Sequence, residues 1–513
     1  MNRNVRVASG VGCFTFILHA ATAWRYGYFR DELYFIACAK HLAWGYVDQP
    51  PLVAVAAAAA APFAYHLLAL RILPILAATL TAVLAVRIAR ELGGNLLSQC
   101  MAGLVVALTP ANLLLGNTLT TTSFEPLSWT LVMWCVLRIV RGGEWRWWLA
   151  LTGSLAFGLY GKYSIALLAL SLLIGLALTP QRRVLATRWL PLAAATTVVL
   201  TLPNLLWQHA HGWPMFAVLH GDATSRHSFT TGLQLEYGNL ARNGIAFLIE
   251  QVLYTNPVAA PLWIIGVLAP FRVPALRDLR FLSWTYVALI AQAVVFAAKG
   301  YYIIGVYPAM FVVGSLATQP LFARLRAVRY GYAALVLAVA ATILPLVIPL
   351  LPIERTIAYS QLLGLTGRNG TPPRLVQPIF AEEFGWERLA RDVSRVYDAL
   401  PPAQRARTAI FADTYADAGA IDFYGPRYGL PQAIASQNSY FLWGTRGYDG
   451  ATLVAIGATR VDVLRRYYRR VTLVATSDEP LKWVVEGPAP IYLCTEPIAP
   501  LSTIWPNLGW FGA

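Results

Sequence analysis

The feature that most constrains this chain is a series of apolar runs, each about 20 residues long, within its first 351 residues. A helix of about 20 apolar residues crosses the hydrocarbon core of a bilayer. Hydrophobic residues make up 57% of the chain and charged residues only 13%, which excludes a wholly soluble protein. We therefore predict an α-helical polytopic membrane protein. About eleven transmembrane helices are expected, over residues 7–24, 67–86, 96–115, 124–140, 147–160, 163–179, 189–206, 257–271, 281–298, 303–319 and 331–351.

The positive charge of the chain predicts how these spans are oriented. The net charge is +15, but residues 352–513 hold 15 acidic and 16 basic residues, so nearly all of the excess belongs to the membrane part. Because Lys and Arg collect in cytoplasmic loops, this location explains the charge without a nucleic-acid partner. It predicts a cytoplasmic N-terminus and an external C-terminus. Residues 1–24 also resemble a signal peptide, and we expect them to remain as an anchor. Six arginine clusters mark the cytoplasmic segments: Arg3/Arg6, Arg87/Arg90, Arg138/Arg141/Arg146, Arg182/Arg183/Arg188, Arg272/Arg277/Arg280 and Arg324/Arg326/Arg329.

From residue 352 onward, the composition changes to that of a water-facing domain. Charges of both signs appear, and short β-branched runs alternate with amphipathic stretches. The chain is thus divided into a membrane domain, 1–351, and a C-terminal extracytoplasmic (periplasmic) α/β domain, 352–513. Within the second domain, helices are predicted over 386–400 and 460–470, and strands over 407–411, 452–456, 471–475 and 490–494.

Acidic residues are rare in the membrane domain and are expected mainly on its outer side. Since carboxylates are costly near hydrocarbon, those that occur there suggest a function. Asp31, Glu32 and Asp48 lie in the loop after the first span, and Glu125 lies in the next outer loop. We expect the two loops to converge on one carboxylate cluster at the outer membrane surface. Taken singly, each acid of the first loop has a structural alternative: Asp31 as a helix N-cap, Glu32 as a solvated first-turn acid, and Asp48 as a turn or N-cap residue.

Five motifs lie in order along the membrane domain, at residues 31–52, 117–129, 161–164, 299–302 and 307–308. Together they resemble the bacterial branch of the dolichyl-phosphate-mannose protein mannosyltransferases and aminoarabinose lipid A transferases. These belong to the glycosyltransferase family 39 type, whose fold is called GT-C. The C-terminal domain also looks like the tail common in the bacterial members.

The resemblance implies an enzyme, a hexosyl- or pentosyltransferase, that moves a sugar from a polyprenyl phosphate to an acceptor outside the bacterial cytoplasmic (inner) membrane. The acceptor stays open between lipid A or another glycolipid, a polysaccharide and a protein. By this resemblance Asp31 is the base that deprotonates or orients the acceptor hydroxyl, and Glu32 assists it. Glu125 and Asp48 match acidic positions of the relatives. The aminoarabinose branch has Glu-Lys where this chain has Asp48-Gln49, so a lysine that could contact phosphate is missing.

A polyprenyl phosphate sugar carries its own leaving group, so the chemistry needs no nucleotide, and the sequence contains no P-loop. Lys162 and Lys299 lie at predicted outer ends of spans, where an ammonium group can meet a lipid phosphate. Tyr302 and Tyr307 could add hydroxyl donors. The alternative is that both lysines extend toward lipid headgroups and the tyrosines form an aromatic belt, without any site. A single attack on the anomeric carbon would invert its configuration.

Two features of the sequence suggest other hypotheses. Four histidines, at 209, 211, 220 and 227, suggest a zinc site. No Cys or acidic residue lies at a suitable spacing from them, so we expect neither a metal nor another cofactor.

A polytopic lipid or solute transporter or flippase without transferase chemistry is the alternative function. A transporter predicts acids near the membrane midplane and repeated halves, whereas here the acids lie at span ends and no repeat is visible.

Overall fold

The computed structural model of the chain describes residues 3–224, 240–296, 298–365, 378–457, 461–481 and 488–512. Its contacts divide the chain into two compact units. The helical unit comprises Met1–Ala23, Arg71–Trp207 and Ala223–Leu350. The mixed unit comprises Trp24–Leu70, Gln208–Asp222 and Leu351–Ala513. The first outer loop of the sequence, with Asp31 and Asp48, therefore belongs to the same unit as the C-terminal residues.

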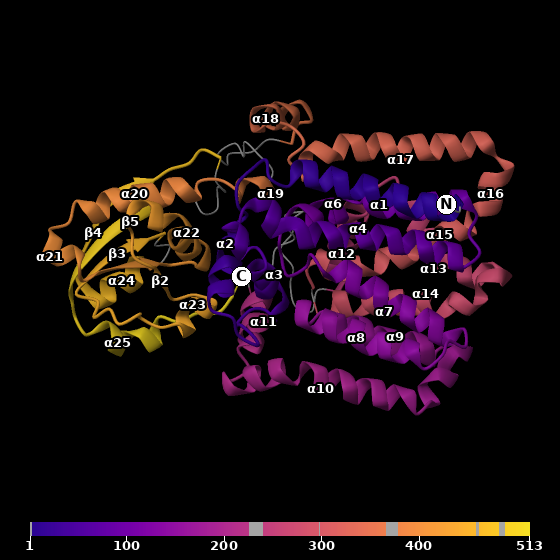
Figure 1. Cartoon of the computed structure of the whole chain (residues 1–513), viewed down its shortest axis with the longest axis horizontal. Helices are drawn as coiled ribbons and strands as arrows, with labels where there is room; N and C mark the ends of the chain where they lie inside the picture. Colours follow the sequence, from indigo (N-terminus) through magenta and orange to yellow (C-terminus); the bar gives the residue numbers. More distant parts are fainter. Residues whose placement is uncertain are drawn as a thin grey trace. The chain divides into compact units, whose positions relative to one another are not determined.

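The helical unit is a bundle of long apolar helices, several of which run side by side in Figure 1. Neighbours in the sequence pack as hairpins, such as α7 on α8, and distant helices pack as well, such as α5 on α15 and α9 on α14. Many large apolar side chains on the outside are exposed, as expected for a surface that lipid covers. The main helices are α1 (Arg3–Thr22), α4 (Leu67–Glu91), α5 (Leu96–Ala107), α6 (Pro110–Asn117), α7 (Glu125–Val140), α8 (Arg146–Gly161), α9 (Ile165–Ala177), α10 (Trp189–Ala210), α12 (Leu240–Tyr254), α13 (Ala260–Arg272), α14 (Arg280–Val295), α15 (Tyr307–Ala317) and α17 (Arg326–Val347).

The polytopic helical architecture is confirmed, whereas the number of eleven spans stays a prediction. By length and apolarity, 5 of the described helices could cross a membrane, or up to 7 if each of two bent helix pairs is one span. One bend, of 56°, separates α5 from α6, where Thr109 caps the helix that begins at Pro110. Since a single apolar run in the sequence contains both helices, hydropathy alone does not show the bend.

One helix of this unit, α12, lies outside the spans that the sequence predicts. In α12, Asn243, Glu250 and Gln251 are buried while Ile245 and Leu248 are exposed. The polar residues interrupt the apolar run on which the sequence-based assignment depends, although they face the protein interior. Helix α12 therefore behaves as an inside-out amphipathic helix, with its polar face inward.

The mixed unit contains the small α/β fold that the sequence predicts. Its five-stranded sheet has the order β2-β1-β3-β5-β4, with β1 parallel to β2 and β3 and with β5 antiparallel to β3 and β4. All four predicted strands are present; β2, only two residues long, was not predicted. The helices α20 (Trp386–Asp398), α22 (Tyr415–Tyr424) and α24 (Val461–Tyr467) pack against the sheet (Figure 1). The strands are β1 (Thr408–Ala412), β2 (Ile434–Ala435), β3 (Thr452–Ile456), β4 (Tyr468–Ser477) and β5 (Ala489–Pro497).

The first outer loop forms an additional layer on this α/β fold. It contains α2 (Arg30–Lys40) and the short helix α3 (Leu52–Ala58), and α2 packs along α22. At their crossing, a Cβ atom on Gly419 would lie 2.8 Å from the carbonyl carbon of Leu33. Only glycine permits so close an approach of the two backbones. The C-terminal residues therefore set the position of the helix that carries Asp31.

Candidate functional site

Asp31 lies in the first turn of α2, in the mixed unit, and two donors converge on one of its oxygens. The Tyr415 hydroxyl donates to Asp31 Oδ1 over 2.8 Å, and Arg30 Nε donates to the same oxygen over 3.3 Å. The Asp31 side chain keeps 27% of its surface exposed. The N-cap of α2 is Phe29, so the alternative of Asp31 as the N-cap does not hold.

Glu32, the next residue, is fully buried and caps the same helix. Its Oε2 accepts a hydrogen bond of 2.9 Å from the backbone N–H of Phe29. This contact satisfies one of the unpaired donors at the start of α2. Glu32 is thus not a solvated first-turn acid, and its carboxylate stabilises the helix that presents Asp31.

Asp48 lies at the other end of the loop and is held by Tyr34. The Tyr34 hydroxyl donates to Asp48 Oδ1 over 2.8 Å and accepts from the backbone N–H of Ser439 over 3.3 Å. Burial raises the pKa of Asp48 to about 7, and the nearby negative charge of Asp31 adds to the rise. Gln49 is fully buried, and its amide lies 3.6 Å from the Cys38 sulfur. The structure therefore places Asp31 and Asp48 in one tyrosine-lined region, with Gln49 inside the loop.

A second group of charged residues lies in the helical unit, around Lys162. Because α7 and α8 form a hairpin, the end of α8 returns to the start of α7, where Glu125 lies. Lys162 Nζ lies 2.8 Å from Thr122 Oγ1 and 3.7 Å from Glu125 Oε2. The Glu125 side chain is 1% exposed and accepts a hydrogen bond from the Ser164 hydroxyl.

Two tyrosine rings complete the environment of Lys162. Its ammonium nitrogen lies 4.7 Å from the ring centroid of Tyr301 and 4.5 Å from that of Tyr302. Both distances suit cation–π attraction. The side chain of Lys162 is 17% exposed, so the charge remains partly accessible. No sequence pattern identifies Thr122 as a contact of Lys162 or Ser164 as a contact of Glu125.

The other two predicted residues of this region differ in their surroundings. Lys299 is half-buried and precedes the 3₁₀ helix η4 (Gly300–Val306). Tyr307 is only 2% exposed, and its hydroxyl donates to Gln251 Oε1 over 2.9 Å. Gln251 also donates to the Gly300 carbonyl oxygen over 2.9 Å. Tyr307 and Gln251 therefore join α12, η4 and α15 in the interior of the helical unit.

The structure adds functional candidates that no sequence pattern identifies. Tyr415 contacts Asp31 across 384 positions of the chain, and Ser439 contacts Tyr34 across 405. Tyr415 and Ser439 lie in the C-terminal domain, and no spacing in the sequence connects them to the first outer loop. Whether the carboxylates of the first two outer loops gather at one place stays a prediction.

The described residues contain no group of three or more His, Cys, Asp or Glu side chains that could hold a metal ion. His209 and His211 lie at the end of α10 and just after it. His227 lies outside the described residues, as does the side chain of His220. The expectation that the protein works without a metal remains a prediction.

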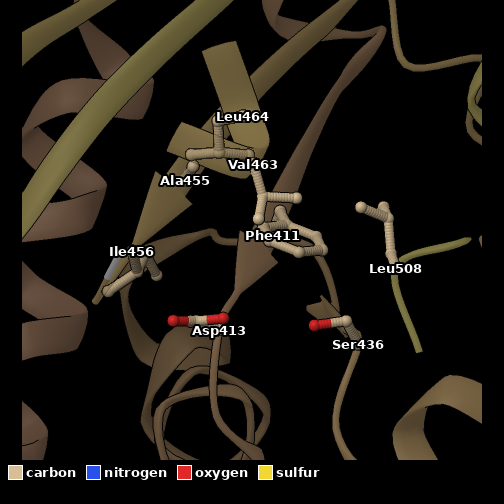
Figure 2. A pocket seen from close by; sticks show the side chains of 8 residues that line it. All are labelled: Phe411, Asp413, Ser436, Ala455, Ile456, Val463, Leu464 and Leu508. Atoms are coloured by element: carbon tan, nitrogen blue, oxygen red, sulfur yellow. The ribbon is translucent and has the colours of Figure 1, made fainter. Parts of the chain in front are cut away.

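A small pocket lies at the carboxyl ends of β1 and β3, where ligands often bind in α/β folds. Figure 2 shows Asp413 and Ser436 on one side of it and apolar side chains such as Phe411 and Leu508 on the other. Its volume is about 10 Å³, which holds at most one water molecule. This pocket is therefore part of the packed domain and not a substrate site.

The bundle of apolar helices and the C-terminal sheet define a class of protein: a multi-pass membrane protein with a small α/β domain. Residues 48–207 match the family model described as dolichyl-phosphate-mannose-protein mannosyltransferase. The crystal structure of ArnT from Cupriavidus metallidurans in the apo state superposes with a TM-score of 0.58 at 15% identity, covering 95% of this chain and 97% of that chain. The structure of the same protein bound to undecaprenyl phosphate superposes with a TM-score of 0.54 at 14% identity, again covering 95% of this chain and 97% of that chain. Among curated proteins, no sequence matches this chain. The resemblance to GT-C glycosyltransferases is thus confirmed.

Proposed function

We propose that this protein is a membrane glycosyltransferase that transfers a sugar from a polyprenyl phosphate to a hydroxyl-bearing acceptor. The observation that carries the proposal is the fold: nearly the whole chain superposes on a protein whose structure has been solved with undecaprenyl phosphate bound. The charged groups around Lys162 and Asp31 supply the chemistry that such a transfer requires.

On the donor side, Lys162 is proposed to hold the phosphate. A partly exposed ammonium group between two tyrosine rings can add a lipid phosphate to its contacts with Thr122 and Glu125. As the sugar leaves, negative charge grows on the phosphate oxygen, and a fixed cation stabilises it. Lys299 and Tyr302 are proposed as further phosphate contacts.

On the acceptor side, Asp31 is proposed as the general base. The acceptor hydroxyl gives its proton to the Asp31 carboxylate while the acceptor oxygen forms a bond to the anomeric carbon. The bond from that carbon to the phosphate oxygen breaks, and its electrons leave with polyprenyl phosphate. This single displacement inverts the anomeric carbon and needs no nucleotide and no metal.

The substrates and the location are proposed at a coarser level. The sugar is a hexose or a pentose, and the acceptor is lipid A, another glycolipid, a polysaccharide or a protein. The reaction is placed at the periplasmic face of the bacterial inner membrane, since the arginine clusters predict that the C-terminal domain lies outside.

A transfer assay in vesicles tests this function against the flippase alternative. Purified protein is reconstituted with polyprenyl phosphates carrying radiolabelled mannose, glucose or aminoarabinose, together with an extract of envelope acceptors. We expect one donor to lose its label to acceptor material while free polyprenyl phosphate appears, and vesicles without protein to show neither. Movement of intact labelled donor between leaflets, without cleavage of any donor, would show a flippase instead.

A further inference from the structure

The two oxygens of the Asp31 carboxylate have different surroundings. Both donors described above, the Tyr415 hydroxyl and Arg30 Nε, bind Oδ1. Among the described residues, no hydrogen bond or ion pair reaches Oδ2. The Asp31 side chain keeps 27% of its surface exposed, and Oδ2 is its oxygen without a donor among the described residues.

Tyr415 is itself firmly held. It is 6% exposed, its ring lies 4.7 Å from that of Tyr34, and its backbone N–H donates to Gln437 Oε1 over 2.8 Å. Burial raises the pKa of its phenol well above the ordinary value, so the hydroxyl stays a donor at neutral pH. Arg30, the second donor, is anchored by Glu382 Oε2 at 3.4 Å.

We propose that Tyr415, from the C-terminal region, is a positioning residue that fixes Asp31 through Oδ1 and leaves Oδ2 as the oxygen that accepts the proton. The inference rests on the proposed function and adds to it a role for the C-terminal domain. A carboxylate held on one oxygen cannot rotate freely, so its other oxygen keeps the orientation that proton transfer needs.

The variant Tyr415→Phe removes only the hydroxyl, and Tyr440→Phe is its matched control. Tyr440 is also buried in the mixed unit, and its hydroxyl donates to Asp422 Oδ2 over 3.0 Å. We expect Tyr415→Phe to lower kcat about 10-fold or more with an unchanged donor KM, and Tyr440→Phe to leave kcat within about twofold. In the double variant Asp31→Asn/Tyr415→Phe, transfer should be no slower than in Asp31→Asn alone.

Two results would overturn the positioning role. One is a Tyr415→Phe enzyme with the kcat of the wild type; the other is a double variant whose loss equals the product of the two single losses. Melting temperatures of both tyrosine variants separate a loss of folding from a loss of catalysis. Failure of the proposed function is distinct, because the wild type itself would then transfer no sugar.

A second, independent feature is a groove of about 940 Å³ in the helical unit, between α1, α4 and the hairpin of α7 and α8. Phe16, Ile17 and Val83 contribute to its apolar wall, and Arg87 and Arg90 lie at one end. Along α4 it extends from Thr79 to Glu91, roughly 18 Å of helix, which is close to one leaflet of the hydrocarbon core.

The charges at the end of the groove do not cancel. Glu91 is neutralised by Arg138 and also accepts a hydrogen bond of 3.0 Å from Trp134. Arg87 and Arg90 are exposed and form no ion pair with any residue in the described ranges. Two exposed positive charges therefore lie at the end of an apolar groove whose length is close to the thickness of one leaflet.

We infer that this groove binds one anionic diacyl phospholipid, with its phosphate at Arg87 and Arg90 and an acyl chain along α1 and α4. Basic pockets between membrane helices bind anionic headgroups in this way. The charge complementarity and the match to one leaflet favour this occupant over a neutral lipid.

Native mass spectrometry of the full-length protein tests this site with phosphatidylglycerol and phosphatidylcholine as probes and with polyprenyl phosphate as a competitor. We expect one phosphatidylglycerol to stay bound, with about tenfold weaker retention in Arg87→Gln/Arg90→Gln. The control Arg272→Gln/Arg277→Gln, which removes two exposed arginines outside the groove, should retain it as the wild type does. Cys13→Trp, which fills the apolar wall without changing charge, should also release it. Equal retention of both lipids, preference for polyprenyl phosphate, or unchanged binding in the groove variants would overturn the inference.

Discussion

At the scale of single residues, the same kind of side chain is placed in very different surroundings. Asp31 keeps a partly exposed carboxylate with donors on one oxygen, whereas Glu125 is 1% exposed and paired with Lys162. The first arrangement suits a group that takes a proton from a substrate. The second holds a lysine beside a buried carboxylate, an arrangement that suits the phosphate contact proposed above.

Removing the lysine should separate these effects. Lys162→Met is expected to slow transfer about 100-fold, because the leaving phosphate loses its cation. It should also destabilise the fold by about 3 kcal/mol, because it leaves Glu125 buried without its partner. In Lys162→Met/Glu125→Gln, we expect stability to recover and transfer to stay low. Thermal unfolding measures the stability of each variant, and the vesicle assay measures its transfer rate. Transfer at the wild-type rate in Lys162→Met would exclude a phosphate role for this lysine.

The pKa of Asp48 predicts how stability depends on pH. Because the folded pKa is about 7 and the ordinary value is 3.8, the folded state binds a proton more tightly than the unfolded chain. Ionisation of Asp48 therefore lowers stability as pH rises from about 4 to 7. In Asp48→Asn this contribution is absent. The melting temperature of the variant minus that of the wild type should therefore be larger at pH 8 than at pH 5. The same difference in melting temperature at pH 5 and at pH 8 would contradict the raised pKa of Asp48.

At the scale of elements, apolar runs and alternating strands could be predicted from the sequence, but contacts between distant elements could not. The apolar or β-branched runs that form α7, α8 and β3 follow local patterns, so the sequence predicts these elements. Helix α12 lies outside the predicted spans, because its buried polar residues interrupt the apolar run. The packing of α2 on α22 depends on a glycine, Gly419, that no local pattern identifies as a contact.

Gly419, which lies where α22 crosses α2, provides a test of this packing. In Gly419→Ala the new methyl group would meet the backbone of Leu33, so the two helices must separate. We expect a loss of about 1–3 kcal/mol and reduced transfer, because the helix that carries Asp31 shifts. Gly331→Ala is the control, since a Cβ there meets nothing within 4 Å and Ala favours a helix. Equal unfolding temperatures for the two variants would show that α2 tolerates the displacement.

At the scale of the whole molecule, the resemblance of short motifs predicted the GT-C fold correctly. The candidate site was predicted only in part. Its acids and lysines stand in recognisable motifs, but Tyr415, which contacts Asp31, and Ser439, which contacts Tyr34, come from segments whose approach depends on the complete fold. The first outer loop belongs to the mixed unit together with the C-terminal residues, a grouping that the linear order of the chain does not suggest.

The orientation of the chain can be checked by labelling single cysteines in intact cells. In a background without Cys13, whose side chain is exposed, a cysteine at Arg395 should react with a membrane-impermeant maleimide. A cysteine at Arg182 should react only after the membrane is opened, because its cluster is expected on the cytoplasmic side. The reverse labelling pattern would place the C-terminal domain in the cytoplasm.

The most direct test of the central claim is the initial rate of sugar transfer by Asp31→Asn beside the wild type, at equal protein in the same vesicles. Asparagine keeps the size of the side chain and can still accept the hydrogen bond from Tyr415, but it cannot take a proton. We predict a rate at least 100-fold lower with unchanged binding of the polyprenyl phosphate donor. A rate equal to that of the wild type would contradict the account.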